Sequence, residues 1–102
     1  MTLDISQLHQ DDWRASIGGG HFDRGVRYAA EGRSQLLSLH QQTLMASCRG
    51  TSGQVYRQRI QLQAQEFGWR IDGHCGCPVR YNCKHVVAAL LTLQAQQEAG
   101  LP

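Results

Sequence analysis

Three of the four cysteines in this chain of 102 residues lie close together, with a histidine beside them. The segment reads CGCPVRYNCKHVV, with a C-x-C pair followed, after five residues, by a C-x-H pair. Three thiolates and one imidazole are a donor set of closed tetrahedral zinc sites, which supply folding free energy when they bind the metal. The spacing therefore predicts one structural Zn2+ held by Cys75, Cys77, Cys83 and His85.

Backbone geometry limits how these four side chains can converge. Residues two apart on a regular helix point about 200° away from each other, so Cys75 and Cys77 are expected in a turn that Gly76 makes flexible. Cys83 and His85 precede an apolar helical pattern, which predicts Cys83 near the helix cap and His85 in the first turn. Thiolates are favoured there by the exposed N–H groups of a helix N-terminus.

Four other chemistries compete for these residues. One, a nucleophilic pair of Cys83 and His85, would leave Cys75 and Cys77 without a role. A disulfide between Cys75 and Cys77 would close a strained, very small ring. An iron–sulfur cluster with three cysteines and one histidine is chemically feasible, but CDGSH-type clusters place three residues where this chain has only Lys84. A catalytic zinc needs an open coordination position and an adjacent acid or base, and the nearest acid, Asp72, precedes the cluster on an expected strand end.

The remaining cysteine, Cys48, shares one strand face with Leu44 and Ala46. Free cysteine behaves as a small hydrophobic side chain, so Cys48 is expected in the core rather than at the metal. His40, on the preceding strand, is expected at the surface, and so is His9, partly buried, near the N-terminus.

An antiparallel sheet is indicated where the apolar period changes from 3.6 to 2 after Gly32. Four strands with short connections are expected, over residues 35–40, 44–49, 54–63 and 67–72. On the third strand, Tyr56, Ile60 and Leu62 share one face, and Arg57 and Arg59 lie on the other.

Along the chain, two helices are expected before the strands and one after them. The first covers residues 4–14, and Gly18–Gly20 is expected to be a flexible connection. The second covers residues 22–31, with Asp23 as N-cap, Gly32 as C-terminal stop, and an apolar stripe of Val26, Ala29 and Ala30. Gly25 inside it indicates close packing against another backbone. The last follows Cys83 and carries Val86, Val87, Leu90, Leu91 and Leu93.

The chain is thus expected to be one α+β domain, residues 1–102, containing a four-stranded antiparallel meander. It divides into a helical segment 1–32, a sheet 33–73 and a zinc-binding segment 74–98. There is no apolar run of membrane-spanning length and no signal-peptide pattern, so a cytoplasmic protein without a membrane partner or a small-molecule substrate is expected. The net charge of +2 is uneven: residues 1–31 are acidic and residues 32–102 basic, which is compatible with nucleic acid as partner.

The motif C-x-C-P, a short loop, and C-K-H before an apolar helix resembles the SWIM-type zinc finger, over about residues 75–91. A weaker likeness links Phe22–Gly25, Tyr28 and the strands through Cys48 to the segment that precedes the finger in bacterial SWI/SNF-family helicases. The resemblance implies a non-catalytic accessory domain of a larger DNA-dependent ATPase. It also implies DNA, the remaining ATPase domains, or another protein as partner.

Two functions therefore remain open. In the first, the domain binds DNA through basic side chains, for which the candidates are Arg57, Arg59, Arg80 and Lys84. In the second, it is a docking module for proteins, without contact to nucleic acid. No G-x-x-x-x-G-K-[ST] motif is present, so the domain itself is not expected to hydrolyse ATP.

Overall fold

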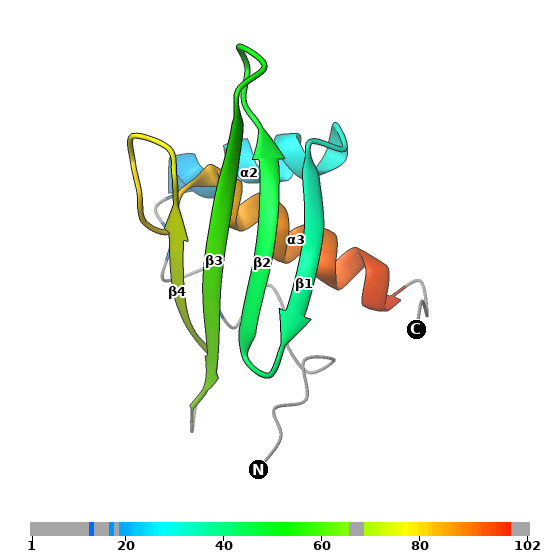
Figure 1. Cartoon of the computed structure of the whole chain (residues 1–102), viewed down its shortest axis with the longest axis vertical. Coiled ribbons are helices and arrows are strands. Elements are labelled where there is room, and N and C mark those ends of the chain that lie inside the picture. Colours follow the sequence, from blue (N-terminus) through cyan, green and yellow to red (C-terminus); the bar gives the residue numbers. More distant parts are fainter. Residues whose placement is uncertain (1–12, 14–16, 18, 66–68, 99–102) are drawn as a thin grey trace.

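The computed structural model describes Trp13, Ile17 and residues 19–65 and 69–98. Two helices and four strands follow one another along these residues: α2 (Gly19–Ala30), β1 (Ser34–His40), β2 (Thr43–Arg49), β3 (Val55–Ala64), β4 (Trp69–Cys75) and α3 (Lys84–Glu98). The predicted α+β class and the four-stranded meander are confirmed (Figure 1). No described helix is long and apolar enough to cross a membrane.

The sheet has the order β1-β2-β3-β4, and each neighbouring pair is antiparallel. Side chains alternate between the two faces because the period of a strand is two residues. Leu44, Ala46 and Cys48 of β2 are buried on the inner face, as are Ile60 and Leu62 of β3. The predicted faces are therefore confirmed, and Cys48 belongs to the core.

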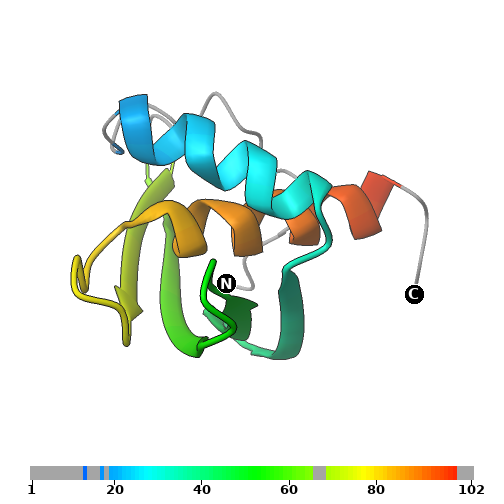
Figure 2. The same cartoon turned by 90° about the horizontal axis from the view of Figure 1, so that it is seen from above.

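Helix α3 lies between the sheet and α2, which forms the outer layer (Figure 2). Its residues 86–90 are all fully buried, because one side of the helix packs on the strands and the other on α2. The sequence VVAAL in this stretch carries no polar side chain, as expected for a helix covered all round.

Helix α2 begins earlier than the sequence predicted and presents a different face. Gly19 and Gly20 lie in its first turn rather than in a connection, and Asp23 is an exposed residue inside the helix rather than its N-cap. Val26 was expected on the buried stripe, but it is 43% exposed. The buried face instead carries Gly25, because only the absence of a side chain lets α3 approach this closely.

The C-terminal end of α2 was predicted correctly. Gly32 has φ of 70°, the left-handed conformation that favours glycine. The N–H of Gly32 donates to the carbonyl of Ala29 at 3.0 Å, and the N–H of Arg33 donates to that of Tyr28 at 3.0 Å. These two bonds form a Schellman motif, which ends the helix and turns the chain into β1.

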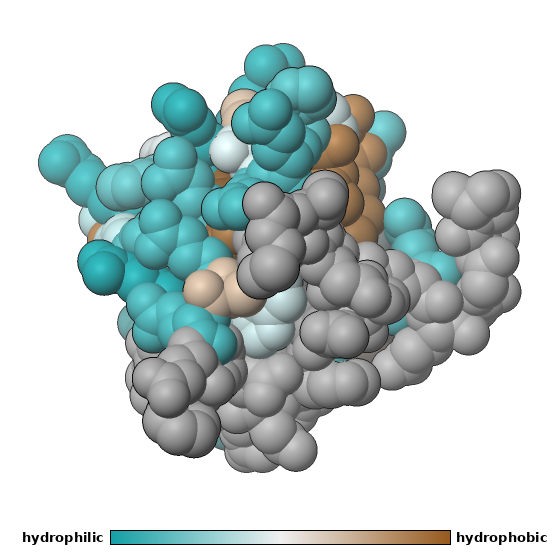
Figure 3. Space-filling view, turned by 90° about the horizontal axis from the view of Figure 1, so that it is seen from below, coloured by the Kyte–Doolittle hydropathy of each residue, from teal (hydrophilic) through white to brown (hydrophobic). Residues whose placement is uncertain are grey.

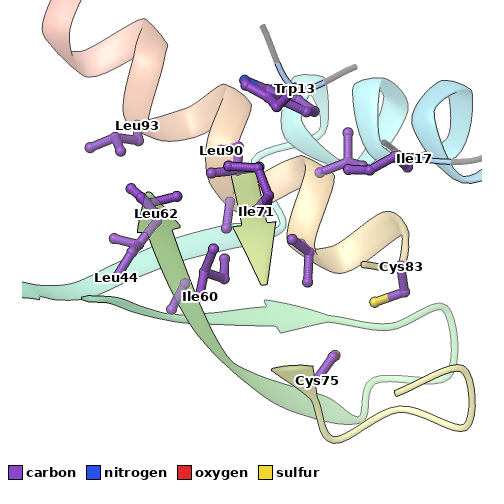
Figure 4. Close-up of a cluster of buried hydrophobic side chains, with 14 of the residues drawn as sticks. Trp13, Ile17, Leu44, Ile60, Leu62, Ile71, Cys75, Cys83, Leu90 and Leu93 are labelled. Atoms are coloured by element: carbon purple, nitrogen blue, oxygen red, sulfur yellow. The ribbon is translucent and has the colours of Figure 1, made fainter. Parts of the chain in front are cut away.

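The expected helix over residues 4–14 and His9 lie outside the described residues, apart from Trp13. Trp13 is fully buried, and its ring lies 5.9 Å from that of Phe22 on α2. Figure 4 shows the main core cluster running from Leu93 and Leu44 at one end to Cys75 and Cys83 at the other. The cysteines thus close one end of the core.

Candidate metal centre

Cys75 is the last residue of β4, so the sheet itself fixes its position. It lies directly opposite Gln58 of β3 in the register, on the inner face. The chain bends only after it, at Gly76 and Cys77. The predicted turn therefore begins one residue later than expected. Gly76 has no positive φ, and a Cβ there would make only ordinary contacts with Arg57.

Cys83 and His85 lie at the start of α3, as predicted. Cys83 precedes the first helical residue, and its carbonyl accepts the N–H of Val87 at 3.1 Å, which is the first bond of the helix. The N–H of Val86 donates to the Cys83 sulfur. A sulfur thus occupies the position of an N-cap acceptor, where N–H groups and the helix dipole favour negative charge.

The four predicted ligands converge. One ligand atom from each of Cys75, Cys77, Cys83 and His85 lies within 4.8 Å of all the others, and all four residues are buried. The Nδ1 atom of His85 lies 3.6 Å from the sulfur of Cys75 and 3.5 Å from that of Cys83, so Nδ1 is the nitrogen that faces the cluster.

The donor set fits zinc. Three sulfurs and one imidazole nitrogen, all withdrawn from water, form a closed site of the structural kind. All four cysteines are free, and Cys48 is outside the cluster, as expected. Burial raises the pKa of the Cys48 thiol to about 11, as expected for a core thiol. The cluster is thus consistent with one structural Zn2+, which would cross-link the end of β4 to the start of α3.

The loop between the cysteine pairs is held by backbone and amide hydrogen bonds. Asn82, at φ 43°, accepts the N–H of Gly73 through Oδ1 at 2.8 Å and donates through Nδ2 to the carbonyl of Ile71 at 3.1 Å. The N–H of Cys75 donates to the carbonyl of Arg80 at 2.8 Å. The loop therefore continues the edge of β4 and delivers Cys83 to the cluster.

Hydrogen bonds within the cluster shift the pKa values of two of its cysteines in opposite directions. The pKa of Cys75 is lowered, chiefly because the Cys83 thiol donates a hydrogen bond to its sulfur, and His85 and Gln58 add to this effect. The pKa of Cys83 is raised by the same bond and by burial.

Several contributors to the site were not singled out by the sequence. The ring of Tyr56 lies 4.9 Å from that of His85, and the ring of Tyr28 lies 5.6 Å from it, so that aromatic side chains from β3 and α2 surround the ligand. Gln58 and Asn82 contribute hydrogen bonds. Gln58 could have been found from the sequence, because it is a polar residue on the face of β3 that also carries Ile60.

Tyr81 ties the loop to β4 through a carboxylate. Its hydroxyl donates to Asp72 at 2.6 Å, and this bond, more than the nearby Arg70, holds the pKa of Asp72 below its ordinary value. A lowered folded-state pKa stabilises the protein above the ordinary carboxyl pKa, and the stabilisation is lost as pH falls through the folded-state pKa.

Replacing Tyr81 with phenylalanine is therefore expected to raise the pKa of Asp72 toward its ordinary value. An NMR titration of the Asp72 carboxyl measures this directly. The variant should be less stable than the parent at neutral pH, and the difference should vanish in acid. Arg70→Gln is the comparison, with a smaller expected shift; a larger shift for Arg70→Gln would contradict the assignment.

The four predicted nucleic-acid contacts do not form one cluster. Arg57 and Arg59 are exposed on the outer face of β3, and Arg80 is exposed in the loop. Lys84 lies on the helical side, with Nζ 5.3 Å from the centre of the Tyr28 ring. The structure thus separates Lys84 from the sheet pair.

In a comparison with protein families, residues 71–94 match the family model described as the SWIM zinc finger. Comparisons with curated proteins and with solved structures give no match. The matched segment runs from Ile71 in β4 through the loop into α3, and it contains all four converging ligands. The segment 71–94 of this chain is therefore similar to SWIM zinc fingers, and its Cys3His cluster is consistent with one structural Zn2+.

Proposed function

We propose that this zinc-binding module belongs to a SWI/SNF-type DNA-dependent ATPase and that the outer face of its sheet binds the phosphates of DNA. The parent protein is inferred from the likeness of the segment before the finger to that in bacterial SWI/SNF-family helicases. The sequences flanking this chain test it: two helicase lobes there would support the assignment, and an unrelated domain would remove it.

The observation that carries DNA binding is the charge of the outer sheet face. Side chains directly opposite in neighbouring strands share a face, and the register of the strands places four arginines on this one: Arg49, Arg57, Arg59 and Arg70. Among the described residues of the strands, Asp72 is the only acid. It is engaged by Arg70 at 3.3 Å and by the Tyr81 hydroxyl, so it offsets little of this positive charge.

Arginines on an exposed face suit contacts with phosphate oxygens, which dominate the affinity of nucleic-acid binding. Arg80 is exposed in the loop that follows β4, and Lys84 stays a predicted contact on the helical side. Residues two apart on one strand lie about 7 Å apart. Of the four predicted contacts, only Arg57 and Arg59 are therefore close enough to contact neighbouring phosphates of one DNA strand without rearrangement.

The test measures affinity for a short duplex and for a single strand as salt is varied. With two to four phosphate contacts, log K for the duplex should fall with log salt with a slope of about −2 to −4. The variant Arg57→Glu with Arg59→Glu should lose nearly all binding. The matched control carries Arg24→Glu with Arg27→Glu on the exposed side of α2, in the layer opposite the sheet, and should retain most of it (Figure 2).

If neither nucleic acid binds at low salt, DNA binding by this module is wrong. An equal loss in both double variants would show that only net charge matters and would remove the sheet face as the site. Either outcome leaves the zinc centre untouched, because none of the four substituted residues is a ligand.

One observation favours protein docking as the second candidate. Leu37 and Leu39 of the edge strand β1 are 48% and 41% exposed. Seen from below, polar residues dominate the β3 and β4 side, and an apolar area lies toward β1 (Figure 3). A partner bound through this area should tolerate moderate salt, whereas binding of DNA to the arginines should not.

A further inference from the structure

One buried polar side chain beside the metal centre is not required by the fold. Gln58 points to the inner face of β3, where it is 1% exposed among apolar neighbours. It lies between Ala46 of β2 and Cys75 of β4 in the sheet register. An apolar side chain of similar size would satisfy this position, as Ile60 and Leu62 do two and four residues later.

The two N–H groups of the Gln58 amide have defined partners. Nε2 lies 2.8 Å from the carbonyl oxygen of Tyr56 and 3.3 Å from the sulfur of Cys75. The other end of the amide, Oε1, is buried and has no hydrogen-bond partner among the described residues. Burying such an acceptor unpaired costs free energy, so the fold alone gives no reason for glutamine here.

What offsets that cost is the bond to sulfur. A hydrogen bond to an ionised acceptor is roughly twice as strong as one between neutral groups, and Cys75 must be a thiolate to bind a metal. Hydrogen bonds from neighbouring groups orient metal ligands and alter their donor strength. The Nε2 atom of Gln58 is placed to orient Cys75 and to alter the donor strength of its sulfur. It approaches this sulfur from the neighbouring strand, and the Nδ1 atom of His85 lies 3.6 Å from the same sulfur.

We propose that Gln58 is a positioning residue of the zinc centre. Its N–H disperses negative charge on the Cys75 thiolate and holds that sulfur toward the other three ligands. The bound thiolate is thereby less nucleophilic toward electrophiles, and the metal is released more slowly. This inference rests on zinc binding by the SWIM finger.

The test compares Gln58→Met, which keeps the length of the side chain and removes the N–H donors, with Gln61→Met on the exposed face of the same strand. Both variants are loaded with Co2+ to report on the thiolates. Without the hydrogen bond, the sulfur lone pairs rise in energy, so the sulfur-to-cobalt charge-transfer band of Gln58→Met should move to lower energy. The band of Gln61→Met should not move.

The zinc-loaded proteins provide the second readout. Alkylation of Cys75 by iodoacetamide, located by mass spectrometry, should be faster in Gln58→Met, and a chelator should remove its zinc more readily. Loss of a group that supports a metal ligand typically lowers metal affinity 10- to 100-fold, and an effect of about 10-fold is expected here. Gln58→Glu, which places a carboxylate beside the thiolates, should weaken zinc binding further.

A measurement on the unaltered chain covers the case in which Gln58→Met does not fold. After loading with spin-active cadmium, one side-chain amide proton of Gln58 should show scalar coupling to the metal through the sulfur. Absence of that coupling overturns the proposal. So does a Gln58→Met protein with lowered thermal stability but an unchanged cobalt band and unchanged Cys75 alkylation. If the parent chain binds neither zinc nor cobalt, the zinc assignment itself fails, which is a different result.

Discussion

Replacing Cys83 with serine is expected to abolish stable zinc binding and the cooperative unfolding of this domain. The Cys83 sulfur has two roles, as a metal ligand and as the acceptor of the Val86 N–H at the start of α3. Serine keeps the second role, because its hydroxyl is a good N-cap acceptor, and loses the first. The variant therefore isolates the contribution of the metal.

The expected effect is large because zinc binding and folding are coupled. Apparent binding free energies of structural zinc are about 10–16 kcal/mol in zinc-finger peptides, which equals or exceeds the stability of a typical domain. In this chain the ligands join the end of β4 to the start of α3, and α3 is the central layer of the core. A loss of even about 5 kcal/mol would lower Tm by more than about 20 °C in a domain of this size.

Metal analysis and thermal unfolding by circular dichroism measure both effects. The parent should carry one zinc per chain, and treatment with a chelator should reproduce the Cys83→Ser result. The matched control is Cys48→Ala, which removes the one cysteine outside the cluster. This variant should keep one zinc, and its free energy of unfolding should fall by about 1 kcal/mol, as for deletion of one buried methyl group. A metal-free chain with unchanged unfolding would contradict the zinc assignment.

Replacing Gly25 with alanine is expected to destabilise the packing of α2 on α3. A Cβ at this position would overlap the side chain of Val87 and lie 2.9 Å from the carbonyl oxygen of Lys84. Backbone cannot yield as the end of a flexible side chain can, so the helices must move apart. Overpacking of this kind typically lowers the free energy of unfolding by about 1–3 kcal/mol, and the overlap here places the expected decrease at about 3 kcal/mol.

Gly20 in the same helix is the matched control. A Cβ on Gly20 would meet nothing within 4 Å, so Gly20→Ala should stabilise the protein by up to about 1 kcal/mol through helix propensity. Denaturant unfolding of the two variants should thus give changes of opposite sign. Adding Val87→Ala to Gly25→Ala should recover part of the loss, because it removes the overlapping atoms. Equal effects of Gly25→Ala and Gly20→Ala would show that α2 does not pack as described.

The metal centre was predictable because its signal is local. Few chemistries other than metal binding use cysteine and histidine at these spacings. The same spacings predict a turn at the first cysteine pair and a helix start at Cys83 and His85. The strands were predictable for a similar reason: the alternation along β2 and β3 fixes which residues share a face. Gly32 also carries its own signal, since glycine is favoured in the left-handed conformation that ends α2.

The predictions were wrong for α2, where packing against another helix decides which residues are buried and where the helix begins. Of the predicted apolar stripe, Ala29 packs partly against the core, but Val26 and Ala30 are exposed. Helix α3 packs against Gly25 and Tyr28. Glycines 19 and 20 suggested a connection, yet they form the beginning of α2. Propensity is a weak guide in such places, because tertiary packing contributes more free energy than the preferences of single residues.

The sequence by itself thus determined the Cys3His cluster, the strand faces and the helix that follows Cys83, because short-range spacing and period specify them. Only the tertiary structure decided that α3 is enclosed between the sheet and α2, that Lys84 lies apart from Arg57 and Arg59, and that the amide of Gln58 meets the sulfur of Cys75. Each of these depends on contacts between residues distant along the chain. Such contacts are set by strand register and by the close approach of helices, which local spacing does not encode.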